Sequence, residues 1–219
     1  MIQRLSSYDL ILFDCDGVIL DSNQLKTDAF FKVAKKFNLD SALELAAYNK
    51  AHGGVSRSIK FKHYIEKILP KYKQIKLSVD QLTYDYSLIV KEELLKCNLS
   101  PALRGLKDLL KSNWAVISGG DQDELRQVFK ERAIEQYFDL GVWGGPLSKF
   151  DIVKMNFIHF SSSNVLFLGD SELDYQVAKF FGFDFMFIYG WSELQNWENF
   201  VSCNSLNCFE SLEAILVEN

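Results

Sequence analysis

The sequence is poor in the features that mark disulfide-linked, zinc-binding and membrane-spanning proteins. Its 219 residues include only four cysteines, Cys15, Cys97, Cys203 and Cys208, with no CxxC pair and no histidine at metal-ligand spacing. This pattern argues against a structural zinc site or a disulfide framework and fits a reducing cytoplasm. No apolar run approaches the roughly 18 residues of a membrane span, and Met1–Asp9 is too short and polar for a signal peptide. We therefore expect a cytoplasmic protein that does not enter a membrane.

Positive charge is not in excess either. The formal net charge is −5 at pH 7, which gives no global field to attract nucleic acid. Lysines that lie near one another, such as Lys35 and Lys36, are best explained as solvated helix and loop surfaces, so no nucleic-acid partner is expected. The hydrophobic content of 48%, with 18 phenylalanines, predicts a packed globule with room for one α/β domain and a smaller second one.

Residues 23 to 97 have a helical pattern throughout and contain no strand signal. The first helix has an apolar stripe in which residues recur every four positions: Leu25, Ala29, Val33 and Phe37. Ser41 and Glu44 have the spacing of a capping box that opens a second helix. A third helix is predicted over about 56–69, stopped by Pro70, and a fourth begins near Ser78.

Outside this block, short apolar runs alternate with helical stretches. The runs lie at Leu10–Phe13, Trp114–Ile117, Phe138–Val142, Val165–Leu168 and Phe185–Ile188. The helical stretches lie at about 102–111, 121–135, 150–160 and 173–182, with a terminal helix near Phe209–Val217. This alternation predicts an α/β fold with a Rossmann-like, doubly wound, mainly parallel sheet. Residues 1–20 and 98–219 would form this core, and 21–97 an all-helical insertion after the first strand.

The most informative segment is the end of that first strand, where Asp14, Asp16 and Gly17 come directly after the apolar run. The residues after a buried parallel strand lie at its carboxyl edge, where open α/β sheets bind ligands. Two carboxylates so close together are costly to bury without a cation or a proton between them. A hard, oxygen-seeking cation such as Mg²⁺ is the simplest relief.

Ser118, Gly119 and Gly120 follow the run Trp114–Ile117 and precede a helix. A hydroxyl and two amides without side chains can hold a phosphate oxygen at such a place. The alternative is a plain loop in which the glycines only permit the turn. Asp121 and Glu124 fit a capping box for the next helix and need no catalytic role.

Two further segments carry charge at the start of a helix. Lys149 opposes the helix dipole there, which makes sense if an anion faces it, although an exposed lysine is the simpler explanation. Asp170 and Asp174 follow the run Val165–Leu168. If the strands that precede Asp14 and Asp170 are neighbours, their carboxylates converge and form a Mg²⁺ site. A helix N-terminus that merely favours acids explains the second pair alone, but not its match with the first.

Together these segments resemble the haloacid dehalogenase-like hydrolase superfamily, because their order and spacing agree over roughly residues 9–190. The string DxDG at Asp14–Gly17 resembles the first family motif, Ser118 the second, Lys149 the third and GDxxxD at Gly169–Asp174 the fourth. The helical insertion resembles the C1-type cap of the family. Asp21-Ser22 and GVSR at Gly54–Arg57 resemble the branch that contains phosphoglycolate phosphatases and β-phosphoglucomutase.

The resemblance implies a Mg²⁺-dependent phosphatase that acts on a small phosphorylated metabolite such as a sugar phosphate. Asp14 would attack phosphorus, and Asp16 would protonate the leaving oxygen and then activate water. The implied Mg²⁺ ligands are Asp14, the backbone carbonyl of Asp16, and Asp170. The implied phosphate-binding residues are Ser118, Gly119 and Lys149, with Asp174 supporting the metal or Lys149 from behind.

In the cap, the resemblance assigns substrate contacts to Arg57 and Lys26, although either could be a surface residue. β-Phosphoglucomutase has a histidine where this sequence has Lys26, so a phosphomutase is the main alternative. Phosphonate-cleaving relatives use a cap lysine as a Schiff base, which leaves that reaction open for Lys26. A non-catalytic binding protein has no need of Asp16, and the 2-haloacid dehalogenases do not require it.

Overall fold

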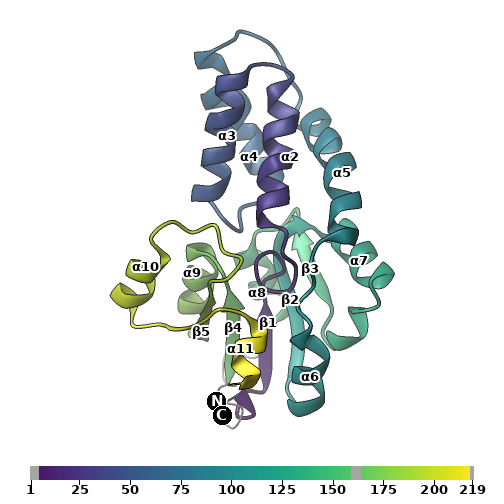
Figure 1. Cartoon of the computed structure of the whole chain (residues 1–219), viewed down its shortest axis with the longest axis vertical. Helices are drawn as coiled ribbons and strands as arrows, with labels where there is room; N and C mark the ends of the chain where they lie inside the picture. The colour runs from purple at the N-terminus through teal and green to yellow at the C-terminus, as the bar shows by residue number, and fades with distance from the viewer. Residues whose placement is uncertain (1–4, 159–163, 218–219) are drawn as a thin grey trace.

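The computed structural model describes residues 5–158 and 164–217, and in them a six-stranded sheet forms the centre of the fold (Figure 1). The strand order is β3-β2-β1-β4-β5-β6, and the five described strand pairs are all parallel. The strands are β1 (Leu10–Phe13), β2 (Asn113–Asp121), β3 (Val142–Gly145), β4 (Val165–Gly169), β5 (Asp184–Ile188) and β6 (Asn207–Phe209). The parallel sheet predicted from the sequence is confirmed.

Helices cover both faces of this sheet. They are α6 (Ala102–Leu109), α7 (Gln122–Glu131), α8 (Lys149–Asn156), α9 (Glu172–Phe181), α10 (Trp197–Asn204) and α11 (Leu212–Val217). Side chains alternate between the faces along a strand. In β1, Ile11 and Phe13 belong to the core shared with α6, α7 and α11, whereas Leu10 and Leu12 belong to the core shared with α8, α9 and α10. The doubly wound arrangement is therefore confirmed.

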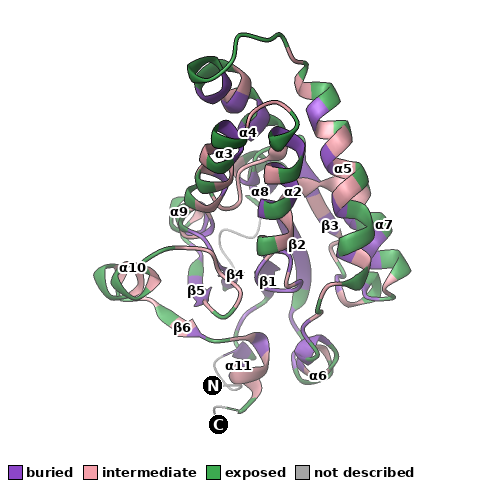
Figure 2. Cartoon of the chain, turned by 45° about the horizontal axis from the view of Figure 1, so that its top comes forward, coloured by how far each residue is buried: buried purple, intermediate pink, exposed green. Residues whose placement is uncertain are grey.

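A group of helices from residues 23–96 stands over the carboxyl edge of the sheet (Figure 1). This helical group contains α2 (Asn23–Lys35), α3 (Leu39–Ala51), α4 (Arg57–His63), a π-helical turn (Tyr64–Ile68), a 3₁₀ turn (Leu69–Lys71) and α5 (Val79–Lys96). Its buried faces turn toward one another (Figure 2), and Phe30, Phe61 and Tyr86 form an aromatic cluster between α2, α4 and α5. The expected insertion after the first strand is present and is wholly helical.

The two segments that connect this helical group to the sheet run side by side. Leu20 forms a β-bridge with Leu99, and the Asp21 amide donates a hydrogen bond of 3.0 Å to the Asn98 carbonyl. Both segments therefore lie at one place near the end of β1. The helical group is joined to the sheet there by a short, paired connection.

The structure corrects several local predictions. Asn38, and not Ser41, caps α3, because its side chain accepts the Ser41 amide at 2.8 Å. The third helix is interrupted after His63 by the π-helical turn. The run that contains Phe138 is not a strand: this ring lies in a loop against Phe13, and β3 begins at Val142. Neither α10 nor β6 was predicted, and the last two positions of the stretch 150–160 lie outside the described residues.

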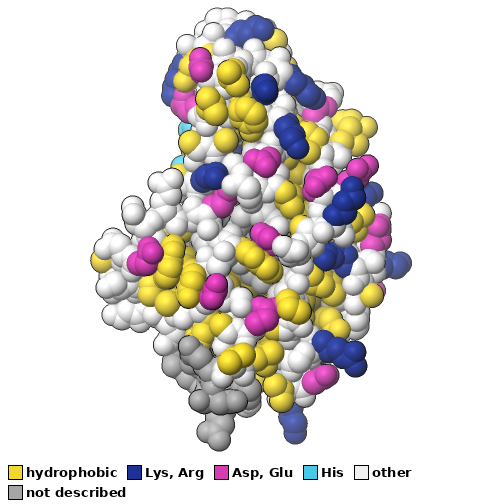
Figure 3. Space-filling view, in the orientation of Figure 1, with side chains coloured by type: hydrophobic (Ala, Val, Ile, Leu, Met, Phe, Trp, Pro, Cys, Tyr) yellow, Lys and Arg dark blue, Asp and Glu magenta, His cyan; other side chains and the backbone are white. Residues whose placement is uncertain are grey.

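Within the described residues, the longest helix is α5, with 18 residues. None of the described helices combines the length and the apolar character that crossing a bilayer requires. In the space-filling view, acidic and basic side chains are interspersed over the visible face and gather into no large patch of one sign (Figure 3).

Candidate active site

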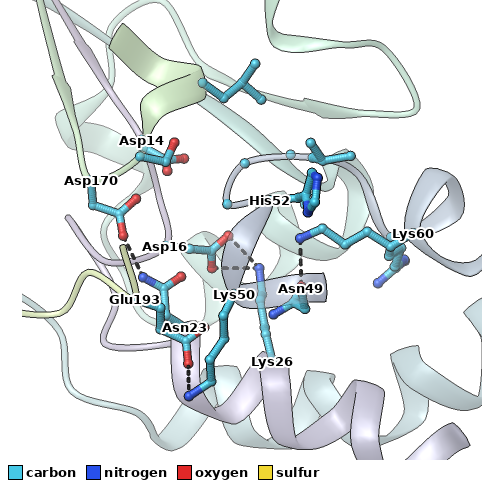
Figure 4. A pocket seen from close by; sticks show the side chains of 18 of the residues that line it. Asp14, Asp16, Asn23, Lys26, Asn49, Lys50, His52, Lys60, Asp170 and Glu193 are labelled. Carbon is cyan, nitrogen blue, oxygen red and sulfur yellow. Dashed lines mark hydrogen bonds and ion pairs between the residues drawn. The ribbon is translucent and has the colours of Figure 1, made fainter. Parts of the chain in front are cut away.

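The residues that come after β1 and β4 meet at the carboxyl edge of the sheet. These strands are neighbours, with Phe13 opposite Leu168, so Asp14 and Asp170 leave the sheet side by side. Between this edge and the helical group lies a cavity of about 230 Å³ (Figure 4). Asp14, Asp16 and Asp170 line it from the sheet, so the condition set in the sequence analysis, that the strands before Asp14 and Asp170 are neighbours, is met.

Asp14 is buried at the floor of the cavity, with 2% of its surface exposed. One carboxylate oxygen, Oδ1, accepts the Cys15 amide at 2.7 Å and lies 2.8 Å from the ammonium of Lys149. Burial and the charge of Asp174 raise the pKa of Asp14, and Lys149 only partly opposes them. The carboxylate is thus fixed in position by two contacts while its negative charge is only partly compensated.

Three carboxylates gather at this point. Asp14, Asp170 and Asp174 each offer an oxygen atom, and these atoms lie within 4.8 Å of one another. Burial, together with Asp14 and Asp174, raises the pKa of Asp170 well above its ordinary value. Lys149 supplies one positive charge to these three acids, at 2.8 Å from Asp14 and 2.5 Å from Asp174. The cluster therefore has the donor set and the surplus negative charge that suit a divalent cation.

Asn23, at the start of α2, was missed by the sequence analysis. Its side-chain amide donates to Asp170 Oδ2 at 2.6 Å and to the Trp191 carbonyl at 2.8 Å. The contact joins residues 147 positions apart, so no local pattern in the sequence could have indicated it. Asn23 orients the carboxylate of Asp170 from the helical side of the cavity.

The side chain of Asp16 points away from the acidic cluster. It accepts a 2.5 Å hydrogen bond from Ser22 and forms an ion pair with Lys26, whose Nζ lies 2.6 Å from Oδ1 and 2.7 Å from Oδ2 (Figure 4). Burial raises the pKa of Asp16, but the charge and hydrogen bond of Lys26 and the bond from Ser22 outweigh it, so the pKa is lowered. Asp16 is ionised in this arrangement.

The predicted phosphate-binding residues lie near Asp14, but not all face the cavity. Ser118 is fully buried, and its hydroxyl accepts the Gly120 amide at 3.0 Å. Lys149 is also buried, with its ammonium between Asp14 and Asp174, so Gly119 is the member of the three that lines the cavity. A Cβ at Gly119 would lie 2.1 Å from the Gly54 carbonyl oxygen. The loop between α3 and α4 therefore rests directly on Gly119, near the carboxyl end of β2.

Arg57 lies in the cavity wall with its guanidinium already engaged. Its Nη1 donates to both oxygens of Glu124 at 3.0 and 3.1 Å, and its Nη2 lies 3.3 Å from Asp121. Asp121 also caps α7, where its side chain accepts the Glu124 amide at 3.0 Å as the sequence predicted. Arg57 thus joins the helical group to α7, a contact that the sequence analysis did not foresee.

Comparison with known proteins identifies a related family. A model of the haloacid dehalogenase-like hydrolases matches residues 11–188, which include the acidic residues after β1 and β4. No curated protein sequence matches the chain significantly.

Solved structures share the fold at low sequence identity. A phosphatase predicted in Clostridium acetobutylicum has a TM-score of 0.71 and 18% identity, over 96% of this chain and 97% of that one. A phosphoglycolate phosphatase predicted in Haemophilus somnus has a TM-score of 0.71 and 19% identity, over the same shares. CbbY from Rhodobacter sphaeroides, crystallised with phosphate, has a TM-score of 0.68 and 13% identity, over 94% and 95%.

Proposed function

The chain belongs to the haloacid dehalogenase-like hydrolase family, and on that premise we propose that it is a Mg²⁺-dependent phosphatase of small phosphorylated metabolites. The observation that carries the proposal is the position of Asp14 at the cavity floor. It belongs to the acidic cluster and lies 2.8 Å from the ammonium of Lys149, with Asp16 two residues further on. A nucleophile, a cation site and an acid–base group are then present within one cavity.

The acidic cluster supports the magnesium part of the proposal. Asp14 and Asp170 would hold Mg²⁺ with the backbone carbonyl of Asp16, and Asp174 would support Lys149 from behind. Burial raises the pKa of Asp14 and of Asp170, and the charges of the neighbouring carboxylates raise both further; a bound cation would neutralise that surplus charge. When bound, the ion supplies charge neutralisation for the carboxylates and for phosphoryl oxygens.

The proposed reaction has two steps. In the first, Asp14 attacks phosphorus, the bond from phosphorus to the leaving oxygen breaks, and Asp16 gives that oxygen its proton. In the second, Asp16 takes a proton from water, the water attacks the aspartyl phosphate, and inorganic phosphate leaves with the Asp14 carboxylate restored. Asp16 is ionised while Lys26 holds it, which is the form that the second step requires. For the first step, the substrate must displace Lys26 so that Asp16 takes up a proton from solvent.

Other residues would bind the phosphoryl group and enclose the substrate. Lys149 lies 2.8 Å from Asp14 and Gly119 lines the same cavity, and with Ser118 they would supply the hydrogen-bond donors that stabilise charge on equatorial oxygens. We assign residues 21–97 to a cap domain and residues 1–20 and 98–219 to the phosphate-binding core. The position of the helical group over the carboxyl edge of the sheet supports this division.

The size of the cavity favours a small substrate. Its volume of about 230 Å³ is below the roughly 300–1,000 Å³ of sites for drug-sized ligands. A variant of the CbbY neighbour has been crystallised with xylulose 1,5-bisphosphate, which makes a sugar phosphate a reasonable substrate class here.

One contact favours a phosphomutase as the second candidate. A mutase must withhold Asp16 from water until substrate arrives, and Lys26 engages that carboxylate at 2.6 Å. The same contact argues against a Schiff-base reaction at Lys26. Although burial lowers the pKa of Lys26, the charge of Asp16 raises it more, so this amine remains protonated and is not nucleophilic.

The test is phosphate release from a panel of phosphomonoesters, with Mg²⁺ and with chelator. A single turnover in ¹⁸O-labelled water should place label in free phosphate. If a hexose 1-phosphate instead gives its positional isomer with little free phosphate, the protein is a mutase. If neither phosphate nor isomer forms from any ester, the proposed function is wrong.

A further inference from the structure

Lys60 is a buried cation on the helical side of the cavity that the proposed reaction does not use. It lies on α4 with 5% of its surface exposed. Its ammonium donates to the side-chain oxygen of Asn49 at 2.6 Å and lies 5.6 Å from the ring centre of Phe30. Figure 4 shows its side chain reaching into the cavity from the side opposite Asp14.

The other cations that line this cavity already have carboxylate partners. Lys26 pairs with Asp16 at 2.6 Å, Lys50 with Glu193 at 3.2 Å, and Arg57 with Glu124 at 3.0 Å. By contrast, Lys60 has no carboxylate of the described residues within 4.0 Å. Its direct polar partner is a neutral amide, which cannot balance its charge.

A chain of hydrogen bonds fixes the direction of this contact. Asn49 donates through Nδ2 to the Thr27 hydroxyl at 2.6 Å, and Thr27 donates to Glu193 at 2.7 Å. Asn49 is therefore held with its oxygen toward Lys60. One proton of the ammonium bonds to Asn49, and the remaining protons are available for a ligand in the cavity.

We propose that Lys60, oriented by Asn49, binds a second anionic group of the substrate, a carboxylate or a second phosphate, at the end remote from the reacting phosphoryl group. The proposal rests on the proposed function, because it needs the reacting phosphoryl group of the substrate to lie beside Asp14. The substrates are then short phosphomonoesters with two anionic ends, and neutral polyol phosphates of the same length are poorer ligands. The proposal also moves recognition of the remote end from Arg57, which Glu124 and Asp121 already hold, to Lys60.

The charges around Lys60 agree with this role. Burial is the main cause that lowers the pKa of Lys60 to about 7, and the positive charges of Lys26 and Lys149 lower it as well. The negative charges of Asp16 and Glu193 act in the opposite direction. An anion bound to the ammonium would supply the missing countercharge and favour the protonated form. Above about pH 7, binding of a substrate with two anionic ends should therefore be coupled to proton uptake by Lys60, and the affinity should weaken as the pH rises further.

The experiment compares pairs of esters that differ only at the remote end. For the carboxylate, phosphoglycolate is paired with 2-hydroxyethyl phosphate. For the second phosphate, propane-1,3-diol bisphosphate is paired with 3-hydroxypropyl phosphate. We expect the protein to prefer one of the two anionic ligands. Lys60→Met should weaken the binding of that ligand on the order of 10-fold or more, while the binding of its neutral partner should change less than about twofold. Which pair shows the preference identifies the anion.

Two further variants separate the charge of Lys60 from its packing. Asn49→Asp keeps the lysine but gives it a carboxylate of its own, so the preference for the anionic ligand should fall there too. Lys62→Met removes an exposed lysine of the same helix and should leave the preference unchanged. In the wild-type protein the ratio of kcat/KM between the members of the preferred pair should fall above about pH 7, and in Lys60→Met it should be flat.

Dissociation constants measured calorimetrically on an Asp14→Asn background keep this test independent of turnover. If no ester releases phosphate from the wild-type protein, the proposed function fails, and the binding data still decide the subsite. Equal affinity for both members of each pair would overturn the subsite. So would an anionic preference that survives Lys60→Met, or one that Asn49→Asp leaves unchanged.

Discussion

The ammonium of Lys26 lies 2.6 Å from one carboxylate oxygen of Asp16 and 2.7 Å from the other, so α2 holds the proposed acid–base group in its ionised form. Both side chains are largely shielded, with exposed fractions of 12% and 17%. A pair so placed is costly to break from one side, because the partner is left as an unpaired buried charge.

Lys26→Met should therefore destabilise the protein at pH 7 by about 3 kcal/mol. In the wild type the lowered pKa of Asp16 gives a stabilisation that is present above the ordinary pKa of 3.8 and is lost only as the pH falls through the lower folded value. In the variant, burial dominates and raises the pKa, so acid relieves the cost. The gap between the two unfolding free energies should narrow from pH 7 to about pH 4.5, and a gap that widens would contradict the ion pair. Lys26→Arg is the matched control.

Asp14→Asn should lower phosphate release by on the order of 10³-fold or more, because an amide cannot form the aspartyl phosphate. The fold should survive, since burial and Asp174 make the charge of Asp14 unfavourable and Lys149 keeps its bond to Asp174. Thermal unfolding should thus show a midpoint no lower than that of the wild type. Near-normal turnover would remove Asp14 from the role of nucleophile.

Chelation should abolish activity and Mg²⁺ should restore it. The cation should also raise the thermal midpoint, because it binds the folded acidic cluster and relieves repulsion between Asp14 and Asp170. Asp170→Asn should reduce this rise, whereas Asp28→Asn, on the outer side of α2, should not. A midpoint that does not respond to Mg²⁺ in the wild type would contradict the metal site, whatever the activity shows.

Arg57→Ala and Glu124→Gln should act in the same direction. If Arg57 works by joining α4 to α7, each variant loosens the same contact, so KM rises for short and long esters alike and the double variant adds little. If Arg57 instead binds substrate, freeing it in Glu124→Gln should lower KM, while Arg57→Ala raises it. Steady-state kinetics of the four proteins distinguish the two roles by the sign of the change.

Lys60→Met should change how stability depends on pH. The folded pKa of Lys60 is lowered to about 7 from 10.5, so the unfolded chain binds more protons between these values and the wild type gains stability as the pH rises through them. The variant should lack this part of the slope and should be more stable than the wild type below about pH 7. Chemical denaturation at several pH values measures the free energy of unfolding and its slope with pH. The control variant Lys62→Met should retain the wild-type slope.

The sequence predicted those parts of the fold in which local patterns and buried surfaces agree. Apolar runs that end in acids or glycines predicted that Asp14, Gly119 and Asp170 lie at one edge, and the parallel sheet brings them together. The prediction was wrong where an apolar residue is buried outside a regular element. Phe138 has the composition of a strand but packs from a loop against Phe13.

Contacts between distant segments were beyond the reach of the sequence. Lys60 looks like any lysine of a polar helix face, and its burial depends on Asn49, Thr27 and Glu193 from three other segments. Arg57 was expected to contact a substrate because of the family resemblance, and its partner Glu124, 67 positions away, was not indicated by any local pattern. In both cases the residue type was visible, but its countercharge, or the lack of one, was set by tertiary structure.

The contact between Gly54 and Gly119 bears on how fast the cavity can exchange its contents with solvent. Main chain meets main chain there, since a Cβ at Gly119 would lie 2.1 Å from the Gly54 carbonyl oxygen. A seal made of side chains opens by rotamer changes in picoseconds to nanoseconds, whereas a seal made of backbone opens only when whole helices move, in about microseconds to milliseconds. A product that leaves the cavity past this contact is released at the pace of the slower motion, and its turnover then has an upper bound that does not depend on the chemistry at Asp14.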